Sequence, residues 1–146
     1  MTRFFIVLLA SVTLFMGTPA LAHASGHGPC DGRAADIKPS YGRTVITKRV
    51  VQLVRCAVNR WPVSGGLSMA LCIVDRESSF WPWAYNASGA SGLFQQMDWA
   101  NRVPYYLHRR WFPNHWQPGA FNARANVLLS IQMMHRGGLG PWGGGC

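Results

Sequence analysis

Acidic side chains are scarce in this sequence. Its 146 residues include 5 of them, against 14 lysines and arginines, and Glu77 is the single glutamate. The resulting positive charge favours anionic partners. The shortage also leaves very few carboxyl groups for acid–base chemistry. Glu77 is therefore either a solvated surface residue, the ordinary case for a glutamate at a helix end, or a residue with a special role.

Long apolar segments are scarce too, and only residues 4–16 form one. A run of 13 residues is short for a membrane span. It follows a basic start and precedes Ala-Leu-Ala, which predicts a signal peptide over 1–22 with cleavage after Ala22. A cut after Ala24 and an uncleaved anchor are the alternatives. We expect a secreted protein, extracellular or in the cell wall, that meets the membrane only through its signal peptide.

Removing 22 of the 146 residues leaves 124, enough for one compact domain but not for two. Arg3 is removed with the signal peptide, so the remaining chain has 13 basic and 5 acidic side chains and a net charge of +8. We predict an irregular N-terminal arm over 23–44 and a folded domain over 45–146. For an exported protein this charge favours anionic cell-wall polymers as partners. We expect no binding to nucleic acid. A charge that serves solubility alone is the alternative.

The sequence contains only four cysteines, Cys30, Cys56, Cys72 and Cys146, and all of them follow the signal peptide. An even number in a small exported domain predicts two disulfides, and the spacing leaves three pairings open. The sequence has no Cys-x-x-Cys motif and no close Cys/His pair, so a zinc site is not expected. We expect no other metal and no cofactor.

Hydrophobic periodicity predicts helices over 47–59, 67–78 and 123–135. Asn122 is the predicted cap of the last helix, and Gly137 and Gly138 its stop. A shorter helix over 98–103 is predicted to be capped by Asp98 and limited by Pro104. Residues 79–96 show no sustained period and are predicted to form loops with a small hairpin region. Residues 104–119 are predicted to form a loop over the core.

Glu77 falls at the end of the second predicted helix. Positions 70, 73 and 74 lie on the same side of that helix and are all apolar. We therefore expect apolar side chains beneath the Glu77 carboxyl. Burial disfavours the ionised form of a carboxyl group, which lets it hold a proton near neutrality and act as a general acid beside a cleft.

Glu77 also begins a longer pattern. Ser78 follows it, then Pro82 and Ala84, and then Gly-Ala-Ser-Gly-Leu-Phe-Gln at residues 89–95, starting twelve residues after the glutamate. This arrangement resembles the signature of the soluble lytic transglycosylases and related lysozyme-like muramidases, including the resuscitation-promoting type. The resemblance extends more weakly to residues 122–127 and 137–142, and in all it covers residues 50–146.

The resemblance implies an α+β, predominantly α, lysozyme-like single domain, in which a small loop or hairpin region faces the helices across a cleft. It implies a monomer that cleaves the β-1,4 bond between N-acetylmuramic acid and N-acetylglucosamine in peptidoglycan glycan strands. Animal lysozymes tie a cysteine at the offset of Cys72 to the C-terminal part of the chain. The resemblance therefore favours the pairs Cys72–Cys146 and Cys30–Cys56.

The same resemblance assigns roles to particular residues. Glu77 matches the catalytic acid/base, Gln95 a glutamine near the cleft floor, and Met97 a methionine two residues beyond it. Asn86 departs from the family, which commonly has a serine at that position. Its amide could still donate a hydrogen bond to a sugar or to the glutamate. Ser88 or Ser91 are candidates to replace the missing hydroxyl.

Aromatic side chains flank the motif, and aromatic faces pack well against sugar rings. Tyr85 is the candidate for a sugar contact because it neighbours Asn86. Trp81, Trp83 and Trp99 are candidates too, with packing in the core as the alternative.

Most glycosidases use two carboxylates, and a second is hard to find here. Asp75 points away from Glu77 on a helix, Asp31 and Asp36 belong to the N-terminal arm, and Asp98 suits a helix cap better. By the family resemblance, a lytic transglycosylase needs only one glutamate, because a sugar hydroxyl rather than a water attacks. The sequence therefore favours transglycosylation. A hydrolytic muramidase and a non-catalytic cationic wall-binding protein are the alternatives.

Overall fold

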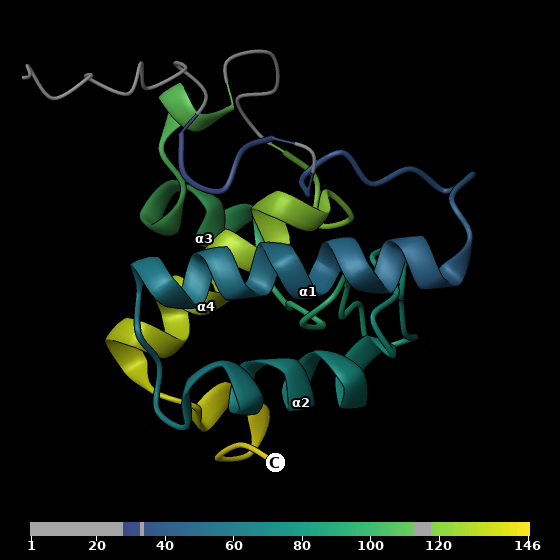
Figure 1. Ribbon diagram of the computed structural model, residues 1–146. Coiled ribbons are helices and arrows are strands. Elements are labelled where there is room, and N and C mark those ends of the chain that lie inside the picture. Colours follow the sequence, from purple (N-terminus) through teal and green to yellow (C-terminus); the bar gives the residue numbers. More distant parts are fainter. Residues whose placement is uncertain (1–27, 33, 113–117) are drawn as a thin grey trace, which may run out of the picture.

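The computed structural model describes residues 28–32, 34–112 and 118–146, and this part of the chain is mostly helical (Figure 1). Four α-helices carry the fold. The predicted signal peptide lies outside the described residues. In chain order the elements are α1 (Arg43–Arg60), α2 (Gly66–Ser78), α3 (Trp99–Tyr106), the short 3-10 helix η1 (Arg109–Trp111), α4 (Ala123–Gly137) and the 3-10 helix η2 (Gly140–Trp142).

The first two helices follow the predicted pattern. In α1 one apolar stripe is buried, running from Ile46 to Val58, and the basic residues between lie outside it. This helix begins at Arg43, so the last two residues of the predicted N-terminal arm are helical. In α2 the buried residues are Ala70, Ile73 and Val74. Both helices pack their apolar stripes inward, and α1 contacts both α2 and α4 (Figure 1).

The helix α4 lies at the centre of the fold. Every residue from Ala123 to Met134 is buried, where the sequence predicted one apolar face only. Burial on all sides requires partners for its polar side chains. Among the described residues, no buried side-chain nitrogen or oxygen lacks a hydrogen bond. The predicted cap is confirmed, since the Asn122 side chain accepts a hydrogen bond from the Ala125 N–H at 3.0 Å.

The short helix α3 corrects two predictions. Asp98 is not a side-chain cap, because its backbone is left-handed with φ 55° and its carboxylate accepts from the Asn101 amide at 2.7 Å. Pro104 does not limit the helix, which continues to Tyr106. A proline removes one backbone donor and strains the preceding turn. Because Pro104 lies near the end of an eight-residue helix, few backbone hydrogen bonds remain for it to disrupt.

Between α2 and α3 the chain forms loops, as predicted, but the hairpin is minimal. The described residues contain no strand, and the only ladder contacts are two isolated antiparallel bridges, Tyr85 with Ser91 and Ser91 with Gln96. Two disulfides, Cys30–Cys56 and Cys72–Cys146, confirm the pairing that the family resemblance favoured. No helix in the described ranges is long and apolar enough to cross a membrane.

The part of the N-terminal arm that the structure describes is held against α1 by Asp36. Its carboxylate accepts a hydrogen bond from the Tyr41 hydroxyl at 2.9 Å and lies 3.5 Å from the Arg49 guanidinium and 3.8 Å from Lys38. The Tyr41 hydrogen bond is the main reason that the pKa of Asp36 lies below its ordinary value. The charges of Lys38 and Arg49 add to the effect, and partial desolvation opposes it.

We predict that Tyr41→Phe raises the pKa of Asp36, which a carbon-13 titration of the carboxyl would measure. A lowered folded-state pKa contributes stability above the unfolded-state value of about 3.9, and this stability is lost as the pH falls through the folded-state pKa. The variant should therefore lose less stability than the wild type on acidification. Tyr105→Phe, on an exposed tyrosine elsewhere, is the control. An Asp36 titration curve unchanged by Tyr41→Phe would contradict the assignment.

Candidate functional site

Glu77 lies in the last turn of α2. Its side chain is 25% exposed, against 33% for that of Asp31 and 52% for that of Asp36. Ala70, Ile73 and Val74, which the sequence placed on the same side of the helix, are fully buried. The lone glutamate is therefore partly withdrawn from solvent, and its carboxylate still reaches the surface.

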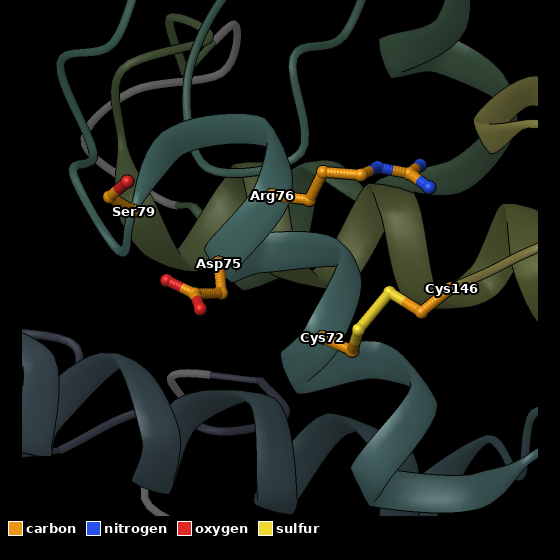
Figure 2. A pocket seen from close by; sticks show the side chains of 5 residues that line it. All are labelled: Cys72, Asp75, Arg76, Ser79 and Cys146. Atoms are coloured by element: carbon orange, nitrogen blue, oxygen red, sulfur yellow. A yellow bond between two sulfur atoms is a disulfide. The ribbon is translucent and has the colours of Figure 1, made fainter.

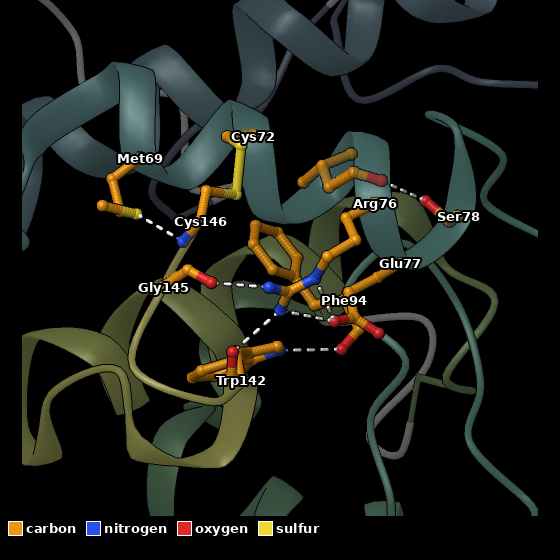
Figure 3. Close-up of polar contacts among 10 residues, drawn as sticks. Met69, Cys72, Arg76, Glu77, Ser78, Phe94, Trp142, Gly145 and Cys146 are labelled. Atoms are coloured by element: carbon orange, nitrogen blue, oxygen red, sulfur yellow. Dashed lines mark hydrogen bonds and ion pairs between the residues drawn. A yellow bond between two sulfur atoms is a disulfide. The ribbon is translucent and has the colours of Figure 1, made fainter.

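The surroundings of Glu77 also include a charged partner. The Arg76 guanidinium donates to Glu77 Oε1 twice, from Nη2 at 2.9 Å and from Nε at 3.2 Å. The same guanidinium donates to the carbonyls of Gly145 at 2.5 Å and Trp142 at 2.8 Å (Figure 3). Residues 138–146, which we call the C-terminal tail, thus meet the end of α2 at the glutamate.

The backbone after Glu77 turns sharply. Ser79 and Phe80 both adopt left-handed conformations, with φ 48° and 60°, and Gln95 does so with φ 46°. For residues other than glycine each such conformation costs roughly 1–2 kcal/mol. Such strain often gathers at functional sites. Of the five such residues in the described ranges, three lie after the glutamate or at the motif glutamine, and the others are Cys30 and Asp98.

The rest of the motif lies in the loop between α2 and α3, residues 79–98, which we call the motif loop. Asn86 organises this loop through its side chain. Its Oδ1 accepts from the Ser88 N–H at 3.0 Å, the Ser88 hydroxyl at 2.6 Å and the Ala90 N–H at 3.1 Å. Ser91 is buried, and its hydroxyl donates to the Gly89 carbonyl at 3.1 Å. These side chains shape the loop. In the described residues none of them is hydrogen-bonded to Glu77, whose partner is Arg76.

Gln95 and Met97 line one cavity of about 210 Å³ together with Gln96, Arg102, Pro141 and Trp142. The Gln95 amide donates to the carbonyls of Ala84 at 3.2 Å and Gly92 at 3.0 Å. No described residue donates to its Oε1. Met97 is 48% exposed. Trp142 of the C-terminal tail lines this cavity, and its backbone carbonyl accepts a hydrogen bond from Arg76, the partner of Glu77. The tail therefore connects the cavity with the glutamate.

The aromatic candidates separate into two groups. Tyr85 is 65% exposed, as a sugar-stacking ring must be. Trp81 and Trp83 are half-buried against the core, with ring centroids 5.0 Å apart in an edge-to-face arrangement. Trp99 is also half-buried and donates from its indole nitrogen to the Pro118 carbonyl at 2.8 Å. Tyr85 is thus the most exposed of the flanking aromatic side chains.

A second hollow, of about 580 Å³, lies beside the same end of α2. Figure 2 shows the side chains that line it, which are Cys72, Asp75, Arg76, Ser79 and Cys146. Asp75 and Glu77 are two positions apart on a helix, which separates their directions by about 200°. Asp75, the nearest carboxylate in the sequence, therefore points away from Glu77, while Arg76 both lines this hollow and bonds Glu77.

The motif loop is fastened to the buried helix α4 by Asn126. This fully buried side chain accepts from the Phe94 N–H at 3.0 Å and donates to the carbonyls of Ser91 at 3.2 Å and Ala120 at 2.9 Å. Gly92 packs directly against it. A Cβ at this glycine would lie 2.3 Å from the Asn126 side-chain nitrogen, and its φ is 78°. Sequence reasoning included Asn126 in a weakly matching stretch without giving it this role.

Two further contributors were missed from sequence. Arg76 directly precedes the glutamate, and Trp142 lies in the weakly matching stretch near the end of the chain. Adjacency to Glu77 could have marked the arginine. Nothing local marks Trp142, because its role depends on a contact made 48 residues away, where its indole nitrogen donates to the Phe94 carbonyl at 3.0 Å.

The described ranges contain no group of three or more histidine, cysteine, aspartate or glutamate side chains that could hold a metal ion. Comparisons with protein-family models, with curated proteins and with solved structures gave no match for this chain. Its function has therefore to be inferred from its own residues.

We predict that Gly92→Ala lowers the free energy of unfolding by about 2–4 kcal/mol, because a left-handed alanine is strained and its methyl group displaces Asn126. Urea denaturation would measure the change. Gly89→Ala is the matched control, since Gly89 also has a positive φ of 91° but has no atom near its Cβ position. It should lose only about 1–2 kcal/mol. Equal losses in the two variants would rule out a specific contact at Gly92.

Proposed function

We propose that this protein is a lytic transglycosylase that cleaves the β-1,4 bond between N-acetylmuramic acid and N-acetylglucosamine in peptidoglycan, with Glu77 as its single acid/base. The observation that carries the proposal is the placement of the only glutamate. Its side chain is 25% exposed, against 33% for Asp31 and 52% for Asp36, and the adjacent Arg76 bonds the C-terminal tail.

In the proposed reaction, protonated Glu77 gives its proton to the glycosidic oxygen, which leaves with N-acetylglucosamine as the bond to C1 of muramic acid breaks. The carboxylate then takes the proton of the C6 hydroxyl of the same muramic acid, and the C6 oxygen bonds to C1. The product is a 1,6-anhydro end. Glu77 recovers its proton and no water is consumed, so a single carboxyl group serves as acid and then as base.

The other carboxylates support a mechanism with one acid. Asp36 is held in the N-terminal arm, Asp98 bonds to Asn101, and Asp31 lies 3.9 Å from the Arg124 guanidinium. Asp75 lines a hollow that does not include Glu77. A glycosidase that activates water places two carboxylates across the scissile bond. Among the described residues, no aspartate is hydrogen-bonded to Glu77.

Other features suit a carbohydrate polymer outside the cell. Tyr85 offers an exposed ring, and the cavity that contains Gln95 and Met97 lies against the same tail as Glu77. The net charge of +8 that remains without the proposed signal peptide favours the anionic polymers and peptide carboxylates of a cell wall. Two disulfides are typical of proteins in oxidising compartments, which agrees with export through the proposed signal peptide.

We predict that Glu77→Gln retains the fold and the binding of purified sacculi but lowers turnover by about a thousandfold or more, because an amide cannot transfer the proton. Clearing of a sacculus suspension would measure turnover, and co-sedimentation would measure binding. Asp75→Asn is the matched control, since it removes a neighbouring charge on the same helix and should leave turnover nearly unchanged. Turnover in Glu77→Gln near the wild-type rate would refute the assignment.

Mass spectrometry of the digest identifies the reaction. Anhydromuropeptides are expected from transglycosylation, whereas reducing ends would show a hydrolytic muramidase. Binding of sacculi by the wild type with no clearing at all would instead identify a non-catalytic wall-binding protein.

A further inference from the structure

The guanidinium of Arg76 stands between Glu77 and the C-terminal tail. We propose that Arg76 is a positioning residue, and that the tail fixes the direction of the Glu77 carboxylate through it. The proposal rests on the role of Glu77 proposed above.

The geometry of the guanidinium carries the first step. It is planar, and its donors point in fixed directions. Two of its nitrogens bond carbonyls of the tail, Nη1 that of Gly145 and Nη2 that of Trp142. With those two bonds made, the plane is fixed, and Nε and Nη2 can meet the carboxylate from one direction only. An ion pair with a half-exposed arginine would otherwise hold its partner weakly.

The tail that holds Arg76 is itself fastened at two points. The Trp142 indole is 5% exposed, packs edge-to-face against Phe94 and donates to the Phe94 carbonyl. At the other end Cys146 is bonded to Cys72, one turn before Arg76 on α2 (Figure 3). The guanidinium therefore contacts a segment that is buried at one end and covalently fixed at the other.

The consequence concerns the two carboxylate oxygens. Both arginine donors go to Oε1, and none of the described residues donates to Oε2. Oε1 is thus the oxygen that is held, and Oε2 is the one that can carry the proton to and from the sugar. Displacing a reacting group by about 1 Å can lower the reaction rate about a hundredfold. The tail would act on that placement without touching the substrate.

The first experiment separates positioning from binding. Arg76→Ala should lower kcat by about tenfold or more and leave KM within about twofold, because the arginine places the reacting group rather than the sugar. Arg76→Lys should lose less. Guanidinium ion at about 20 mM, far below denaturing concentrations, should restore part of kcat to Arg76→Ala. Arg55→Ala, on the exposed side of α1, is the control. An unchanged kcat, or a loss confined to KM, would overturn the proposal.

The second experiment tests whether the tail acts through Arg76. The double variant Cys72→Ser/Cys146→Ser releases the tail and should lower kcat as Arg76→Ala does. Combining it with Arg76→Ala should add little, because both changes remove the same contact. Cys30→Ser/Cys56→Ser, which opens the other disulfide, controls for the loss of a crosslink and should retain kcat. Losses that multiply in the combined variant would show that the tail and the arginine act independently.

A third measurement does not depend on catalysis. Arg76→Ala should raise hydrogen exchange at the backbone amides of residues 142–146, since two of the contacts that hold them are gone. If exchange is faster in Arg76→Ala but the wild type shows no activity, the arginine–tail contact is supported and only the proposed function is rejected. Unchanged exchange would reject the contact, whatever the activity of the wild type.

Discussion

The burial of α4 on every side is the constraint on which the rest of the structure depends. A helix enclosed by other elements needs a partner for each polar side chain it carries. Asn126 finds three in the motif loop and the segment before the helix, and Ser130 accepts from the buried Gln96 amide at 2.7 Å. The interior helix therefore fixes the path of the loop next to the glutamate as well as filling the core.

The proposed site is assembled from three segments that are distant in sequence. The end of α2 supplies Glu77 and Arg76, the loop before α3 supplies Gln95, and the C-terminal tail supplies Trp142. Trp142 connects all three, since its carbonyl accepts from Arg76 and its indole donates to the Phe94 carbonyl. The disulfide between Cys72 and Cys146 keeps the tail next to the helix that carries Glu77.

Much of this arrangement could be predicted from local sequence. Periodicity located α1, α2 and α4, because each has a regular apolar pattern, and the Asn122 cap follows from one residue type at one position. Asp98 failed as a cap because its backbone is left-handed, whereas a capping residue usually has an extended backbone. The full burial of α4 and the contacts of Arg76 with the tail depend on packing between segments more than 60 residues apart, which no local pattern encodes.

The position of α4 in the chain has a consequence for how the fold is completed. The apolar stripe of α1 is covered by a helix that begins at Ala123, 63 residues after α1 ends at Arg60. Contacts over such separations are slow to form, because a long loop must close before they are gained. Until α4 has been synthesised, the part of α1 that it covers lacks its partner, although α1 and α2 can already pack on each other. The interior of the fold is therefore completed only once nearly the whole chain is available.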